Sequence, residues 1–76
     1  MTAFLAVTLA DDAPPARAVN ALRRCPLSVL SVEASAALVV ALLEADTPAA
    51  FAQAEAAVLS VPGTLAETLV TLTPLA

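Results

Sequence analysis

The stretch "ALVVALLEADTPAAF", residues 37–51, decides how this chain folds. Its first half reads like part of a membrane helix, but the uncharged run between Glu33 and Glu44 covers only residues 34–43. A spanning helix needs about 20 apolar residues. The sequence therefore predicts a buried strand over residues 37–44 and no membrane span.

The second half of the stretch predicts the start of a helix. Asp46 or Thr47 can cap it, and Pro48 suits the first turn, where a missing N–H costs nothing. We expect this helix to run to about Ser60, because Pro62 and Gly63 break the pattern there.

Working outward, the remaining segments complete a regular order. Residues 2–10 and 27–33 predict strands, residues 16–24 predict a helix between them, and residues 67–73 predict a last strand. Asp11 or Asp12 is the expected cap of the first helix. The order strand–helix–strand–strand–helix–strand predicts an α+β fold of the ferredoxin-like βαββαβ type. A four-stranded antiparallel sheet would carry two helices on one face, in a single domain over residues 1–76.

Composition excludes several classes of function. The net charge is -4, and the cations are three arginines, so the basic footprint that nucleic acids require is absent. Cys25 is the only cysteine and there is no histidine, so we expect neither an internal disulfide nor a metal site. The chain has no Ser-His-Asp set, no Cys-His pair and no glycine-rich loop. We therefore expect no enzyme and no cofactor.

The N-terminal segment bears on location. It has no positively charged start, and its apolar run is short for a secretory signal. We expect a cytoplasmic protein.

Strand alternation predicts which residues lie on the open face, meaning the side of the sheet that no helix covers. The helix-covered side is predicted to carry Leu5, Val7, Leu9, Val39, Ala41, Leu43, Val70 and Leu72. The open face is predicted to carry Phe4, Ala6, Thr8, Val29, Ser31, Glu33, Val40, Leu42, Glu44, Glu67, Leu69 and Thr71. A register error of one residue would exchange the two sets. An apolar patch of this kind is typical of a binding site or of a dimer interface.

The second half of the chain resembles a known family. "LVVALLEADTPAAFAQAEAAVLSVPGTLAETLVTL", residues 38–72, is similar to the NapD-type assembly chaperones of periplasmic nitrate reductase. The resemblance rests on an apolar strand ending in Glu-Ala-Asp, a helix, a Val-Pro-Gly turn, Leu-Ala and a Thr-Leu-Val strand. The first half is similar more loosely, through an Arg-containing helix and the segment "RCPLSVLSVE" at residues 24–33.

The resemblance implies a small cytoplasmic ferredoxin-fold chaperone without a cofactor or catalysis. Such a protein would bind the twin-arginine signal peptide of the nitrate reductase catalytic subunit and delay export until its cofactor is inserted. On this hypothesis the peptide-binding residues divide by chemistry. Phe4, Val40, Leu42 and Leu69 would hold the apolar segment, and Glu33, Glu44 and Glu67 would meet the arginines. The alternative is a small regulatory or dimerisation module of the ACT or Lrp/AsnC effector type.

Overall fold

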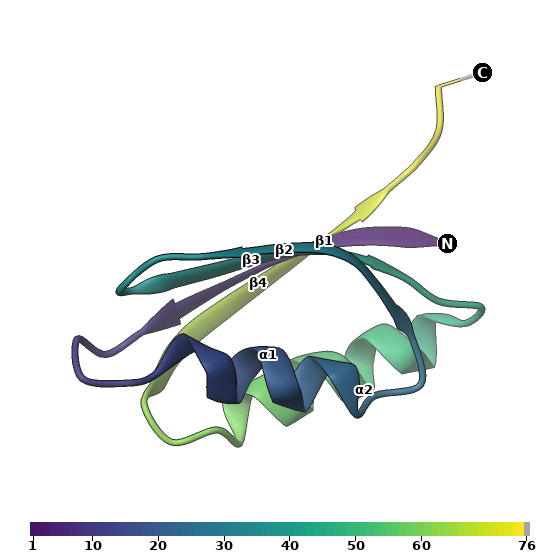
Figure 1. Cartoon of the computed structure of the whole chain (residues 1–76). Helices are drawn as coiled ribbons and strands as arrows, with labels where there is room; N and C mark the ends of the chain where they lie inside the picture. The colour runs from purple at the N-terminus through teal and green to yellow at the C-terminus, as the bar shows by residue number, and fades with distance from the viewer. Residues whose placement is uncertain (76) are drawn as a thin grey trace.

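The computed structural model describes residues 1–75 and contains four strands and two helices. Their bounds are β1 Thr2–Leu9, α1 Pro15–Arg23, β2 Ser28–Ala34, β3 Leu38–Glu44, α2 Pro48–Leu59 and β4 Thr64–Leu72. The strands form one antiparallel sheet in the order β2-β3-β1-β4. Both helices lie on one side of it (Figure 1). The predicted ferredoxin-like βαββαβ fold is thus confirmed.

Proline sets the start of both helices. Pro15 and Pro48 occupy the first helical positions, where their fixed φ suits the helix. The cap residues are Pro14 and Thr47; both have extended backbones, and neither makes a side-chain capping hydrogen bond. The expected caps at Asp11 or Asp12 are therefore wrong. Pro14 and Pro15 follow these aspartates, and the helix begins only at Pro15, with Pro14 as its cap.

The core lies between the helices and the inner side of the sheet. It is built from small and branched aliphatic side chains with one aromatic ring, that of Phe51. The fully buried larger residues are Leu5, Val7, Leu22, Val39, Leu43 and Val58. Helical alanines, such as Ala18 and Ala54, are also completely buried. These short side chains let the helices approach the sheet closely, so a short chain can still form a dense two-layer core.

The two central strands follow the predicted alternation. In β1, Leu5, Val7 and Leu9 face the helices, and Phe4 lies on the other side. In β3, Val39, Ala41 and Leu43 are buried, whereas Val40 and Leu42 are half-buried on the open face. The register pairs Phe4 with Leu42 and Leu5 with Ala41, which fixes both assignments.

The two edge strands differ from the prediction. In β2 the register shifts between Val29 and Ser31, so Leu30 forms a bulge. Val29 consequently pairs with buried Leu43 and faces the helices, while Ser31 and Glu33 stay on the open face.

Strand β4 has the opposite phase from that expected. It begins at Thr64, and its register pairs Leu69 with Leu5 and Val70 with Phe4. Directly paired residues lie on the same face of a sheet. Leu69 therefore packs against the core, and Val70 lies on the open face with 50% of its surface exposed.

Gly63 makes the turn between α2 and β4. Its φ is +92°, a backbone conformation that residues with a Cβ rarely adopt. Its carbonyl oxygen accepts a hydrogen bond of 2.8 Å from the N–H of Ala10, which ties this turn to the end of β1. A Cβ at this position would overlap the methyl group of Ala13. The chain thus needs glycine here both for conformation and for close packing.

Candidate functional site on the open face of the sheet

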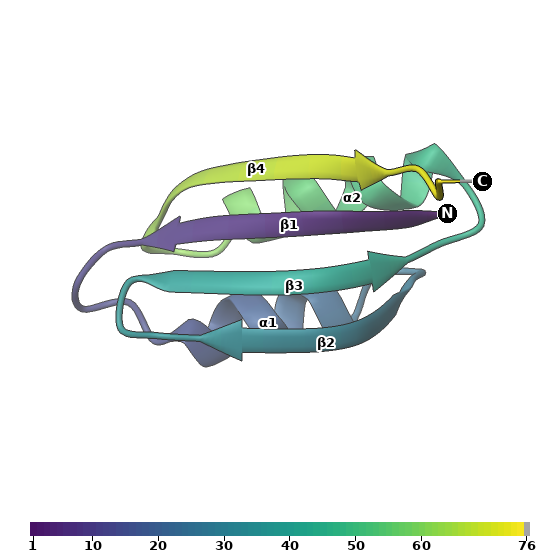
Figure 2. The ribbon, with the colours of Figure 1, turned by 90° about the horizontal axis from the view of Figure 1, so that it is seen from above.

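The open face has an apolar centre that spans three strands. Phe4 lies between Leu42 of β3 and Val70 of β4 in one cross-strand row. In the next row Ala6 lies between Val40 and Thr68. Phe4 is 40% exposed although it is one of only two aromatic residues in the chain. Within residues 1–75 no helix covers this side of the sheet, as Figure 2 shows.

Further apolar side chains extend this centre toward the ends of the strands. Leu38 of β3 pairs with Thr8, and Leu72 of β4 pairs with Thr2. These two leucines are 40% and 42% exposed. Apolar residues grouped on an exposed surface of a small domain are typical of a binding site.

Two carboxylates border this apolar centre. Glu33 of β2 pairs with Val40, and Glu44 at the end of β3 pairs with Thr2 of β1 and Ser28 of β2. Both glutamates are exposed. Val40, the partner of Glu33, lies four residues before Glu44. The rise per residue of a strand therefore separates the two glutamates by about 13 Å along the strand direction. The β2 side of the open face is therefore polar and acidic, and the β1–β4 side is apolar.

The structure places most, but not all, of the predicted site residues on this face. Phe4, Val40, Leu42, Glu33 and Glu44 lie together there. Leu69 and Glu67 do not, because the pairing of β4 with β1 turns both toward the helices. The prediction that Thr71 and Val29 lie on the open face is also wrong. Thr71 pairs with buried Ala3, and Val29 pairs with buried Leu43 just before the bulge at Leu30, so both lie on the helix side.

The open-face residues that the sequence pattern does not predict are those on the outward side of β4. They are Thr68, Val70 and Leu72. Within "ETLVTL" this set has two aliphatic residues and no charge, whereas the alternating set contains Glu67, so composition alone favours the wrong set as the buried one. The pairing partner, rather than the composition of the strand, decides the face.

Glu67 instead forms part of an acidic pair on the helix side. Partial burial raises the pKa of Glu67, and the side chain of Glu55 on α2 raises it further. One of its carboxylate oxygens, Oε2, is buried without a hydrogen-bond partner within residues 1–75. This carboxyl group thus holds its proton more tightly than an exposed glutamate does.

The described residues form neither a cluster of metal ligands nor a membrane-spanning helix. Across residues 1–75, no three His, Cys, Asp or Glu side chains come together in a way that could hold a metal ion. In the same part of the chain, neither helix has the length and apolar character needed to cross a membrane.

Comparison of the chain with protein-family models, curated proteins and solved structures finds no match.

Proposed function

We propose that this protein is a cytoplasmic assembly chaperone whose open face binds the twin-arginine signal peptide of a periplasmic nitrate reductase catalytic subunit. Binding would delay export of that subunit until its cofactor is inserted. The observation that carries the proposal is an uncovered apolar surface centred on Phe4, bordered by Glu33 and Glu44. The resemblance of residues 38–72 to NapD-type chaperones supplies the identity of the peptide.

The surface is complementary to both parts of such a peptide. A twin-arginine signal has two neighbouring cations followed by an apolar segment. The apolar segment would cover Phe4, Leu42 and Val70, and burial of apolar surface stabilises a complex by roughly 25 cal/mol per Å². Arginine can pair with a carboxylate through two parallel hydrogen bonds. Because Glu33 and Glu44 are exposed, each such pair would contribute only about 0–1 kcal/mol.

The direct test is calorimetric titration of the protein with a twin-arginine leader peptide. A second peptide, in which both arginines are replaced by glutamine, is the control. We expect saturable binding that weakens in salt and is weaker for the glutamine peptide. Apolar burial should still leave measurable affinity at high salt, because salt screens only the charged part.

Variants of the protein locate the interaction on the open face. The double substitution Glu33→Gln/Glu44→Gln should weaken leader binding by roughly three- to thirtyfold, in line with one or two lost ion pairs. Asp11→Asn/Asp12→Asn is the matched control, since it removes the same charge from the exposed loop between β1 and α1. Equal loss of affinity in both double variants would show that only net charge matters.

Absence of binding to either peptide would overturn the proposal. If the protein is then dimeric and binds an amino acid, the ACT or Lrp/AsnC type of regulatory module becomes the better interpretation. Sedimentation equilibrium with and without an amino-acid mixture distinguishes that case.

A further inference from the structure

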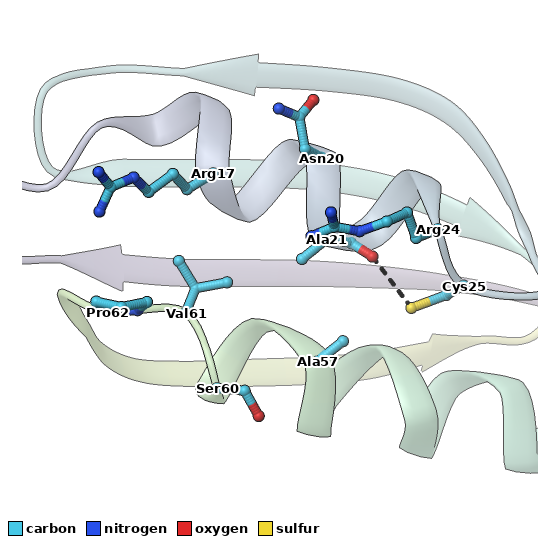
Figure 3. Close-up of a pocket in the computed structure, with 9 residues that line it drawn as sticks. All are labelled: Arg17, Asn20, Ala21, Arg24, Cys25, Ala57, Ser60, Val61 and Pro62. Carbon is cyan, nitrogen blue, oxygen red and sulfur yellow. Dashed lines mark hydrogen bonds between the residues drawn. The ribbon is translucent and has the colours of Figure 1, made fainter.

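A second surface lies on the opposite side of the molecule, between the two helices. We call it the helix groove; it has a volume of about 530 Å³. Its lining comes from α1 and the two residues that follow it, from the C-terminal half of α2 and from the turn after α2 (Figure 3). The lining residues are Arg17, Asn20, Ala21, Arg24, Cys25, Ala57, Ser60, Val61 and Pro62.

The groove is locally positive in an acidic protein. Arg24 is the C-cap residue directly after α1 and lies seven residues from Arg17, so the two arginines lie on the same side of the helix, about two turns from each other. Both side chains are exposed, and none of the described lining residues is acidic. The sequence has one other positively charged side chain, that of Arg23, and it does not line the groove. The net charge of -4 therefore arises from other surfaces.

The floor of the groove is apolar. Ala21 is buried, and Ala57 and Val61 are half-buried. The thiol of Cys25 donates a hydrogen bond of 3.3 Å to the carbonyl oxygen of Ala21, so its hydrogen is already engaged. The sulfur consequently presents a soft, weakly polar surface to the groove.

From this arrangement we infer that the helix groove binds an amphipathic organic anion. The carboxylate, sulfonate or phosphate group of the ligand pairs with the guanidinium groups of Arg17 and Arg24, and its apolar body covers Ala57 and Val61. Guanidinium groups bind such anions through paired, charge-assisted hydrogen bonds. The volume lies within the range of about 300–1,000 Å³ that is typical of small-molecule sites. A hollow between two helices suits a compact ligand better than an extended acidic protein segment.

The test uses 8-anilinonaphthalene-1-sulfonate, a fluorescent amphipathic anion, as the probe. N-phenyl-1-naphthylamine, which has the same kind of ring system without the sulfonate, is the uncharged control. We expect one saturable site for the anion with an affinity that falls as salt rises, and much weaker binding of the uncharged dye. Equal affinity of the two dyes would overturn the inference.

Variants place the probe on the molecule. Arg17→Gln/Arg24→Gln should raise the dissociation constant roughly tenfold or more, as expected for lost charge-assisted hydrogen bonds. Arg23→Gln is the control, because it removes one positive charge from the same helix outside the groove; its effect should stay below about twofold and below that of either single variant, Arg17→Gln or Arg24→Gln. Circular dichroism of each variant verifies that α1 is intact.

A variant of the open face separates the two surfaces. Val70→Ser should leave binding of the anionic dye unchanged. If Val70→Ser weakens dye binding and the arginine substitutions do not, the dye occupies the open face and the inference is wrong. It is also wrong if a polyglutamate peptide binds at Arg17 and Arg24 while the dye does not, since the groove would then serve an acidic protein partner.

Discussion

Gly63 combines two constraints that a single added methyl group violates. Its positive φ costs a residue with a Cβ about 1–3 kcal/mol, and the overlap with Ala13 adds a further overpacking cost. We predict that Gly63→Ala lowers the free energy of unfolding by about 2–4 kcal/mol. Urea denaturation followed by circular dichroism measures this change.

A second substitution separates the two contributions. Ala13→Gly removes the methyl group that Gly63→Ala would meet. The double variant should therefore lose less stability than the sum of the two single variants. Strict additivity would mean that the backbone conformation alone makes glycine necessary.

Glu67 should make the stability of the protein depend on pH. Its pKa is raised in the folded state, first by burial and then by Glu55, so the folded protein binds this proton more tightly than the unfolded chain does. The resulting stabilisation is complete below the ordinary glutamate pKa of about 4.3. This stabilisation is lost as the pH rises from the ordinary glutamate pKa through the raised pKa that Glu67 has in the folded protein. Between these two pKa values, the contribution of Glu67 to the free energy of unfolding therefore falls with increasing pH.

Glu67→Gln tests this pH dependence. An amide does not titrate, so the variant should lose the Glu67 part of the decline in urea-unfolding free energy between about pH 4 and pH 7. Glu33→Gln is the control, since Glu33 is exposed on the open face. An unchanged slope in Glu67→Gln, or the same flattening in both variants, would contradict the role of this carboxyl group.

At the scale of the element, β4 has two sides that serve different purposes. Leu69 packs against the core, and the neighbouring Val70 is half exposed beside Phe4. Leu69→Ala should lower the unfolding free energy by about 1–3 kcal/mol, less than for a fully buried leucine. Val70→Ala should change it by no more than about 0.5 kcal/mol.

The same two variants should have the reverse order in peptide binding. Val70→Ala should weaken binding of the leader peptide, and Leu69→Ala should leave its affinity unchanged at temperatures where the variant is folded. Chemical denaturation and calorimetry on the same samples provide both measurements. If Val70→Ala proves the more destabilising substitution, the register of β4 differs from that described.

The central elements could be predicted from the sequence, and the edge strands could not. In β1 the aliphatic residues Leu5, Val7 and Leu9 alternate with a polar and aromatic set. In β3 both sets are aliphatic, and the terminal Glu44 marks which of them is the open-face set. Proline marks both helix starts. In β2, however, "SVLSV" alternates plausibly in either phase, and the bulge at Leu30 leaves no trace in composition. In β4, the pairing with β1 decides which side chains face the helices and which lie on the open face. This is why Phe4, Val40 and Leu42 were placed correctly and Leu69 was not.

At the scale of the whole molecule, the two candidate surfaces lie on opposite sides and differ in charge. The open face carries Glu33 and Glu44, whereas Arg17 and Arg24 border the helix groove. A cationic peptide is therefore attracted to one side and an organic anion to the other. Each surface can be altered by substitution without changing the contacts of the other.

The central place of β1 also has a consequence for how the chain folds during synthesis. Strand β1 is the first to be made, yet one of its two partners is β4, the last. Until residues 64–72 emerge from the ribosome, one edge of an apolar strand has no partner, and such edges promote aggregation. The sheet can close only after β4 has left the ribosome. Any slowing of synthesis between β3 and β4 would therefore lengthen the time for which the nascent chain needs protection.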